Sequence, residues 1–132
     1  MRTAKQLQEE VSAAFAEGDM ERMFECFAED CVVREAPGLP FGGDWVGHDG
    51  MRAMFAEMAQ NFELQPTLLD VYEPSDSMVI LHTMMRITSK SGETVDMPVL
   101  EIFKSRDDRI VEAIPFYWDG PWLARIAAAG EE

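Results

Sequence analysis

The sequence predicts an α+β fold in which N-terminal helices pack against a mostly antiparallel sheet. Two amphipathic helical patterns open the chain, and a short strand and a third helical pattern follow. Four strand patterns joined by short turns then lead to a short terminal helix. The length of 132 residues suits one domain, and 47% hydrophobic residues suffice to build a core. We therefore expect a single domain over residues 1–132, with the order ααβαββββ before the last helix.

Composition and charge exclude several classes of function. The net charge of −14 argues against binding to nucleic acid or to anionic membrane surfaces, because both need clustered Lys and Arg. No apolar run approaches the length of a membrane span, and the N-terminus MRTAKQLQEE lacks the apolar centre of a signal peptide. Cys26 and Cys31 form no disulfide framework and are interpreted as reduced packing residues. We expect a cytoplasmic protein.

No metal or cofactor is expected. The two histidines and the scattered carboxylates have no recognisable spacing of metal ligands. The Gly42-Gly43 pair lies in a Pro-rich loop and does not follow a strand, so it does not match a phosphate-binding loop.

The first helix is expected over residues 3–17, with Thr3 and Gln6 as a capping box and Gly18 as its end. The second helix begins at Asp19, and its apolar positions recur with helical spacing as far as Phe27. The third is expected over residues 49–61. Strands are predicted over residues 31–34, 67–72, 78–89, 94–104 and 109–118.

The loop over residues 36–47 is rich in Pro and Gly but also contains Leu39, Phe41 and Trp45. Loops are usually polar, so a loop this apolar is expected to fold over something. It either caps the core or forms a lid over a ligand.

Arg34 and Glu35 directly continue the apolar run Cys31–Val33. Neighbouring strand residues face opposite sides, so if the strand enters the core, one of the two charges goes with it. Burying an ionised group is costly unless it is paired or neutralised. Glu35 is therefore a candidate functional residue, and the alternative is that both are solvated loop charges.

Three segments together resemble the nuclear transport factor two-like (cystatin-like cone) superfamily, in its SnoaL-like and steroid Δ-isomerase branch. They are the helix pair joined by Gly18-Asp19, the segment FAEDCVV at residues 27–33, and GHDG at residues 47–50. RI at residues 109–110 and FYWD at residues 116–119 extend the resemblance over nearly the whole chain. It implies a curved mixed sheet that wraps the helices into a cone with an internal apolar pocket.

The resemblance also implies a homodimer formed through the outer face of the sheet. The strand over residues 78–87 is apolar at both odd and even positions, as expected of a strand that is covered on two faces.

In steroid-isomerase-like enzymes a carboxylate at the end of the first strand takes a proton next to a carbonyl, and this position is Glu35. Counting from the hairpin Gly92 places a partner carboxylic acid at Glu101. The tyrosine that such enzymes carry on the first helix is replaced by Val11. Losing one such donor typically costs on the order of 10²–10³ in rate, so we expect an acid/base reaction other than steroid isomerisation.

His82 and Arg86 lie at positions i and i+4 of one predicted strand with Met84 between them, so all three share a face. Matched through Gly92, this face is predicted to line the pocket, with His82 as a catalytic candidate and the other two contacting substrate. A strand bulge would instead turn them to the dimer contact or to solvent. The other predicted substrate-binding residues are aromatic: Phe15, Phe41, Trp45, Phe55, Phe103 and Trp118.

Two functions follow from the resemblance. The first is an enzyme that acts on a hydrophobic carbonyl compound by general acid/base chemistry, with Glu35 as base. The second is a non-catalytic dimeric domain that binds a small hydrophobic ligand or serves as an accessory module.

Overall fold

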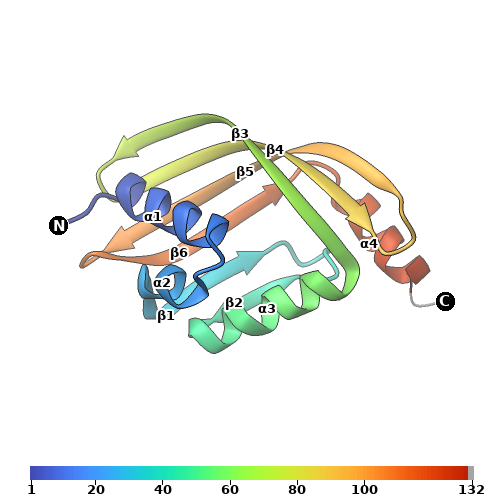
Figure 1. The fold of residues 1–132 in the computed structure, drawn as a ribbon, viewed down its shortest axis with the longest axis horizontal. Helices are drawn as coiled ribbons and strands as arrows, with labels where there is room; N and C mark the ends of the chain where they lie inside the picture. The colour runs from blue at the N-terminus through green and yellow to red at the C-terminus, as the bar shows by residue number, and fades with distance from the viewer. Residues whose placement is uncertain (131–132) are drawn as a thin grey trace.

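Six strands form one curved sheet in the order β2-β1-β6-β5-β4-β3 (Figure 1). The computed structural model describes residues 1–130, with side chains described as far as Ala128. All neighbouring strands are antiparallel except β1 and β6, which are parallel. The strands are β1 (Phe27–Glu35), β2 (Gly43–Val46), β3 (Phe62–Ser75), β4 (Met78–Ser89), β5 (Thr94–Arg106) and β6 (Arg109–Tyr117). This architecture confirms the predicted α+β class with a mixed, mostly antiparallel sheet.

The four helices are α1 (Ala4–Ala16), α2 (Met20–Glu25), α3 (Gly47–Asn61) and α4 (Gly120–Gly130). The predicted capping box is present, because the Gln6 backbone N–H donates to Thr3 Oγ1 at 3.1 Å and the Thr3 N–H donates to Gln6 Oε1 at 2.9 Å. Asp19 caps α2 by accepting from the Arg22 N–H at 3.2 Å. Local chemistry thus sets where the first two helices begin.

The second helix is shorter than its apolar spacing predicts. It ends at Glu25, and the chain is extended from Phe27 onward. The Ile110 N–H donates to the Cys26 carbonyl at 2.8 Å, and Phe27 pairs with Ile110 across the parallel strands. Hydrogen bonding to β6 therefore overrides the helical pattern, which continues locally to Phe27.

One strand was not predicted, and another begins well before its sequence pattern. The loop over residues 36–47 contains the unpredicted β2, which pairs with β1 so that Glu35 is opposite Gly43. β3 begins at Phe62 and includes Pro66, although a proline usually interrupts a strand. It is tolerated because β3 is an edge strand, where a missing N–H need not leave a ladder bond unmade.

The helices close the curved sheet into a cone. α1 packs against β4, β5 and β6, while α3 contacts β1 and β2 at one edge and β3 at the other. In Figure 1, α1 and α2 lie across the concave face, and α3 runs along β1 and β2 before the chain enters β3. The concave face of the sheet is therefore covered by helices, and within residues 1–130 no second layer covers the opposite face.

Both cysteines are free and buried, as predicted. Cys31 Sγ lies 3.5 Å from Met51 Sδ, which places it in the packing between β1 and α3. Within residues 1–130, none of the helices is both long and apolar enough to span a membrane.

Candidate active site

A cavity of about 380 Å³ lies between α1, α3 and the concave face of the sheet. Its walls are mainly apolar, with five methionines contributed by α2, α3 and β4: Met23, Met51, Met54, Met58 and Met85. Phe15 and Leu68, which line it from the end of α1 and from β3, are themselves exposed to solvent. The cavity therefore opens between these two elements, as the resemblance led us to expect of an internal apolar pocket.

Glu35 is the last residue of β1, and its carboxyl group lines the cavity. The strand buries Cys31, Val33 and Glu35 on one face and exposes Arg34 on the other. Glu35 is 4% exposed, and its Oε1 has no hydrogen-bond partner among the described residues. Arg34 faces outward, with its guanidinium 2.8 Å from Asp44 and 2.6 Å from Glu112. Glu35 is therefore the inward member of the pair, without a counterion from its neighbour.

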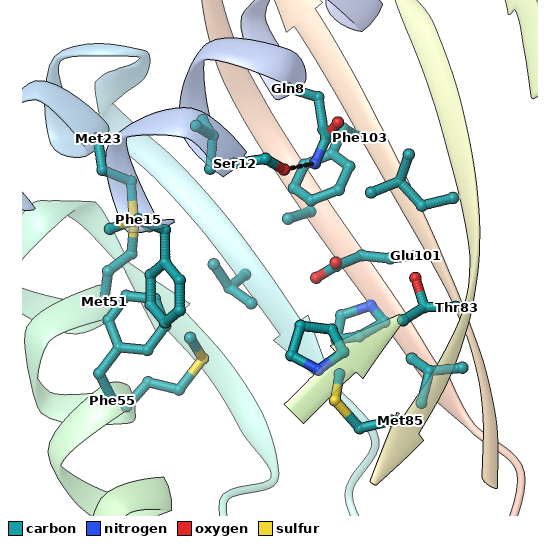
Figure 2. Close-up of a pocket in the computed structure, with 18 of the residues that line it drawn as sticks. Gln8, Ser12, Phe15, Met23, Met51, Phe55, Thr83, Met85, Glu101 and Phe103 are labelled. Carbon is teal, nitrogen blue, oxygen red and sulfur yellow. Dashed lines mark hydrogen bonds between the residues drawn. The ribbon is translucent and has the colours of Figure 1, made fainter. Parts of the chain in front are cut away.

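Glu101 lies on β5, and its carboxyl group points into the middle of the cavity (Figure 2). It is opposite Leu81 on β4 and opposite Pro115 on β6. Val33, two residues before Glu35, pairs with Ala113, two residues before Pro115. Glu35 and Glu101 thus lie on the two strands that flank β6, with Pro115 between them. Because neighbouring strands lie about 4.8 Å apart, the two backbones are about 10 Å apart, and the side chains converge on one space.

Both carboxyl groups bind protons more tightly than usual. Burial, followed by repulsion from Glu101, raises the pKa of Glu35 to about 8. Burial raises the pKa of Glu101 to about 7. Near neutral pH the cavity therefore contains at least one protonated carboxylic acid, poised to exchange a proton with a ligand.

Tyr117 is a third polar group of the cavity that sequence reasoning missed. It is the last residue of β6 and lies opposite Val99, on the face shared with Pro115. Burial, followed by the charges of Glu35 and Glu101, raises its pKa well above the usual value of 10. The phenol therefore stays protonated and can donate a hydrogen bond at any ordinary pH. Alternation along β6 was the available signal, because it lets only one of Tyr117 and Trp118 face the cavity, and the predicted residue, Trp118, is the outward one.

Three of the predicted aromatic wall residues, Phe15, Phe55 and Phe103, do line the cavity (Figure 2). So does Val11, the residue at the position of the family tyrosine. Polar side chains come from α1 and β4: Gln8, Ser12 and Thr83. Gln8 Nε2 donates to Ser12 Oγ at 2.7 Å, so these two partly satisfy each other at the cavity wall (Figure 2).

The prediction that His82, Met84 and Arg86 face the pocket was wrong. Glu101, which faces the cavity, is opposite Leu81, and His82 is opposite Leu100. Successive residues of a strand face opposite sides of the sheet, so His82 faces outward. Leu81, Thr83 and Met85 line the cavity instead. Arg86 pairs on the outer face with Asp96, at 2.9 Å. No bulge interrupts the pairing of β4 with β5, so the regular register alone turns these residues outward.

Phe41, Trp45 and Trp118 do not line the cavity either. Phe41 is buried behind Tyr117, with ring centroids 5.7 Å apart in an edge-to-face arrangement, and also contacts Phe62. Trp45 Nε1 donates to the Phe41 carbonyl at 2.8 Å. The loop over residues 36–47 therefore caps the core and does not form a lid. Trp118 is 80% exposed because it follows Tyr117 on the strand and faces the other way.

Among residues 1–130, no group of three or more His, Cys, Asp or Glu side chains is arranged to hold a metal ion.

Comparison with solved structures shows the same fold in several other proteins. A nuclear transport factor two-like protein of unknown function from Burkholderia pseudomallei has a TM-score of 0.85 and 18% identity, with 96% of this chain and 98% of that chain covered. A candidate polyketide cyclase from Xanthomonas campestris has a TM-score of 0.76 and 20% identity, with 93% and 96% covered. TerC, co-crystallised with polyporic acid, has a TM-score of 0.83 and 16% identity, with 95% and 98% covered.

No curated protein sequence matches this chain. Residues 9–113 match the family described as the SnoaL-like domain, a span that includes both carboxyl residues of the cavity and most of the sheet. Taken with the cone-shaped fold and its internal apolar cavity, this match shows that the chain belongs to the SnoaL-like family of the nuclear transport factor two-like fold.

Proposed function

We propose that the protein is an enzyme that acts on a hydrophobic, carbonyl-containing small molecule by general acid/base chemistry, of the isomerase, cyclase or lyase type. Glu35 is the base. The observation that carries the proposal is Glu35 Oε1, a buried carboxyl oxygen without a partner among the described residues, at the wall of an apolar cavity. An unpartnered buried polar atom is costly, and such groups are characteristic of functional sites.

In the proposed reaction, ionised Glu35 removes a proton from the carbon next to the substrate carbonyl. The electron pair of that C–H bond forms an enolate, whose negative charge develops on the carbonyl oxygen. Protonated Glu101 and the Tyr117 hydroxyl donate hydrogen bonds to this oxygen. In a substrate with a C=C bond next to that carbon, the enolate is conjugated with it. The proton on Glu35 then returns to the far carbon of the conjugated system while the C=C bond shifts, so an isomerisation needs no external reactant.

The pKa values of the pair favour a state with one proton on two carboxyl groups at pH 7–8. We assign the base to Glu35 because its Oε1 is free to accept a proton and because the higher pKa makes it the stronger base once ionised. Placing the proton on Glu101 instead costs about 1.4 kcal/mol for a difference of one pKa unit. One hydrogen bond from Glu101 to a bound carbonyl contributes about 1 kcal/mol and offsets most of this cost.

The test is exchange of the protons next to the carbonyl of 2-tetralone in D₂O, followed by NMR. Wild-type protein is expected to accelerate exchange, and Glu35→Gln is expected to lose at least about 10²-fold, the usual contribution of a general base. Glu101→Gln retains an N–H donor and should lose less. The assignment of the base is overturned if Glu101→Gln abolishes exchange while Glu35→Gln keeps it.

The second candidate is a non-catalytic domain that binds a hydrophobic ligand or serves as an accessory module. The presence of Val11 where steroid isomerases have a tyrosine supports it, because the cavity has one oxyanion donor fewer on α1. In that case wild-type protein and Glu35→Gln both bind 2-tetralone and neither accelerates exchange.

We further propose that the protein is a homodimer formed through the outer sheet face and resides in the cytoplasm, where its free cysteines stay reduced. Large apolar side chains on this face support the dimer: Leu100, Phe116 and Trp118 are all exposed. A contiguous apolar patch of this kind is typical of an interaction surface.

A further inference from the structure

We propose that the cavity selects its ligand by the sign of its charge, accepting uncharged and cationic apolar molecules and rejecting anionic ones. The inference deepens the proposed function, on which it rests for the identity of the binding site. It names the class of substrate: an apolar compound without a carboxylate, phosphate or other anionic group.

The ionisable groups of the cavity are all acids. They are the carboxyl groups of Glu35 and Glu101 and the phenol of Tyr117. Among residues 1–128, whose side chains are described, no Lys, Arg or His lines the cavity. A bound anion would therefore find hydrogen-bond donors in this space but no compensating positive charge.

Two arginines near the carboxyl groups in the chain or in the sheet are held on the outer face. Arg34, next to Glu35, is paired with Asp44 and Glu112. Arg86, on the strand that neighbours Glu101, is paired with Asp96. Both side chains have the strand parity that points away from the cavity, so neither can turn inward without breaking its ion pairs and reversing its face.

The positive ends of the α1 and α3 dipoles also lie outside the cavity. α1 contributes its wall residues from Gln8 onward and α3 from Met51 onward, which in both cases is beyond the first turn. The free N–H groups that bind anions at a helix N-terminus lie within that first turn. Neither side chains nor the N-termini of α1 and α3 therefore supply a positive charge inside the cavity.

An anionic ligand would lose its hydration without meeting a positive charge, and it would be repelled by each carboxyl group that ionises. Burying an unpaired charge is strongly unfavourable, and a third carboxylate beside two carboxyl groups raises this cost as they ionise. A ligand carbonyl, in contrast, accepts a hydrogen bond from a protonated carboxyl group. An ammonium group would give the unpartnered Glu35 Oε1 a charged donor and would favour ionisation of the pair.

The experiment compares three probes that share a naphthalene ring: uncharged 2-acetylnaphthalene, anionic 2-naphthoate and cationic 2-naphthylmethylammonium. Affinities are measured by calorimetry on the full chain at pH 6 and pH 8.5. We expect 2-naphthoate to bind at least about tenfold more weakly than 2-acetylnaphthalene at pH 6. The difference in affinity between these two probes should grow at pH 8.5, because Glu101 and Glu35 ionise. The ammonium probe should bind more tightly at pH 8.5 than at pH 6, with release of a proton.

The double variant Glu35→Gln, Glu101→Gln should lose the pH dependence of all three affinities, while Glu63→Gln, at an exposed position of β3, should retain it. Circular dichroism verifies that each variant is folded. The inference is overturned if 2-naphthoate binds within threefold of the ketone, if the ammonium probe shows no gain with pH, or if none of the probes binds at millimolar concentration.

The two proposals fail separately. If the proposed enzyme activity is wrong, 2-tetralone exchange is absent while the order of the three affinities persists. If charge selection is wrong, the affinities do not depend on the charge of the probe, whether or not exchange occurs.

Discussion

Glu35 and Glu101 lie on the two strands that flank β6 and face one cavity, with Pro115 between them. Burial raises the pKa of both carboxyl groups, and the charge of Glu101 raises the pKa of Glu35 further. This relationship gives the cavity its acid/base capacity, and several measurable consequences depend on it.

Glu35→Gln is expected to stabilise the protein at high pH. The pKa of Glu35 rises from 4.5 to about 8 on folding, so between these values the folded state holds more protons than the unfolded state and stability falls as pH rises. At about 1.4 kcal/mol per pKa unit, the loss is complete above pH 8 and amounts to at most about 5 kcal/mol. Urea denaturation at pH 5, 7 and 9 should show this decline in wild type and a flatter profile in the variant. Equal slopes in both proteins would contradict the burial of an ionisable Glu35.

Glu101→Gln is expected to lower the pKa of Glu35. Repulsion from the Glu101 charge is the second cause of the raised value, after burial, so its removal takes away part of the shift. In ¹³C-NMR titrations of the glutamate carboxyl carbons, the Glu35 midpoint should move below about 8 while staying above 4.5. The ascending limb of any activity dependent on Glu35 should move to lower pH with it. An unchanged midpoint would mean that the two carboxyl groups do not interact.

Tyr117→Phe is expected to slow the proposed reaction while leaving the protein folded. The substitution keeps the ring against Phe41 and removes only the hydroxyl, which donates to the enolate oxygen in the proposed mechanism. Loss of one such donor typically costs about 10²–10³ in kcat. Trp118→Phe, at the next position but facing solvent, is the matched control and should leave the rate unchanged. Similar rates for Tyr117→Phe and wild type would remove Tyr117 from the mechanism.

His82→Gln should leave 2-tetralone exchange within about twofold of wild type. His82 was a catalytic candidate from its spacing to Arg86, but it is opposite Leu100 on the outer face and does not line the cavity. A loss as large as that expected for Glu35→Gln would show that His82 acts on the site from across the sheet.

Phe116→Asp is expected to convert a dimer into monomers, because it places a charge in the apolar outer face proposed to be the interface. Sedimentation velocity measures the change directly. Met20→Asp, an exposed apolar position on α2 away from this face, is the control and should remain dimeric. A wild-type protein that sediments as a monomer would remove the dimer proposal.

Features that depend on local chemistry were predictable from the sequence. The Thr3–Gln6 capping box, the Asp19 cap and the β4–β5 hairpin through Gly92 are made by residues close together in the chain, so their spacing is sufficient to identify them. The alternation of Arg34 and Glu35 was visible as well. Together with the family resemblance, it led to the inward Glu35 and to Glu101.

The tertiary structure alone decided which face of each strand meets the cavity. His82 and Thr83, or Tyr117 and Trp118, are equally plausible wall residues in sequence, and only the register with β5 selects one of each pair. Pairing with β6 likewise turned the end of the second helical pattern into strand, and pairing with β1 created β2. The physical reason is that side chains alternate between the two faces of a strand, so the sequence pattern alone does not show which face is inward. The strands paired with it, which are distant in the chain, decide this.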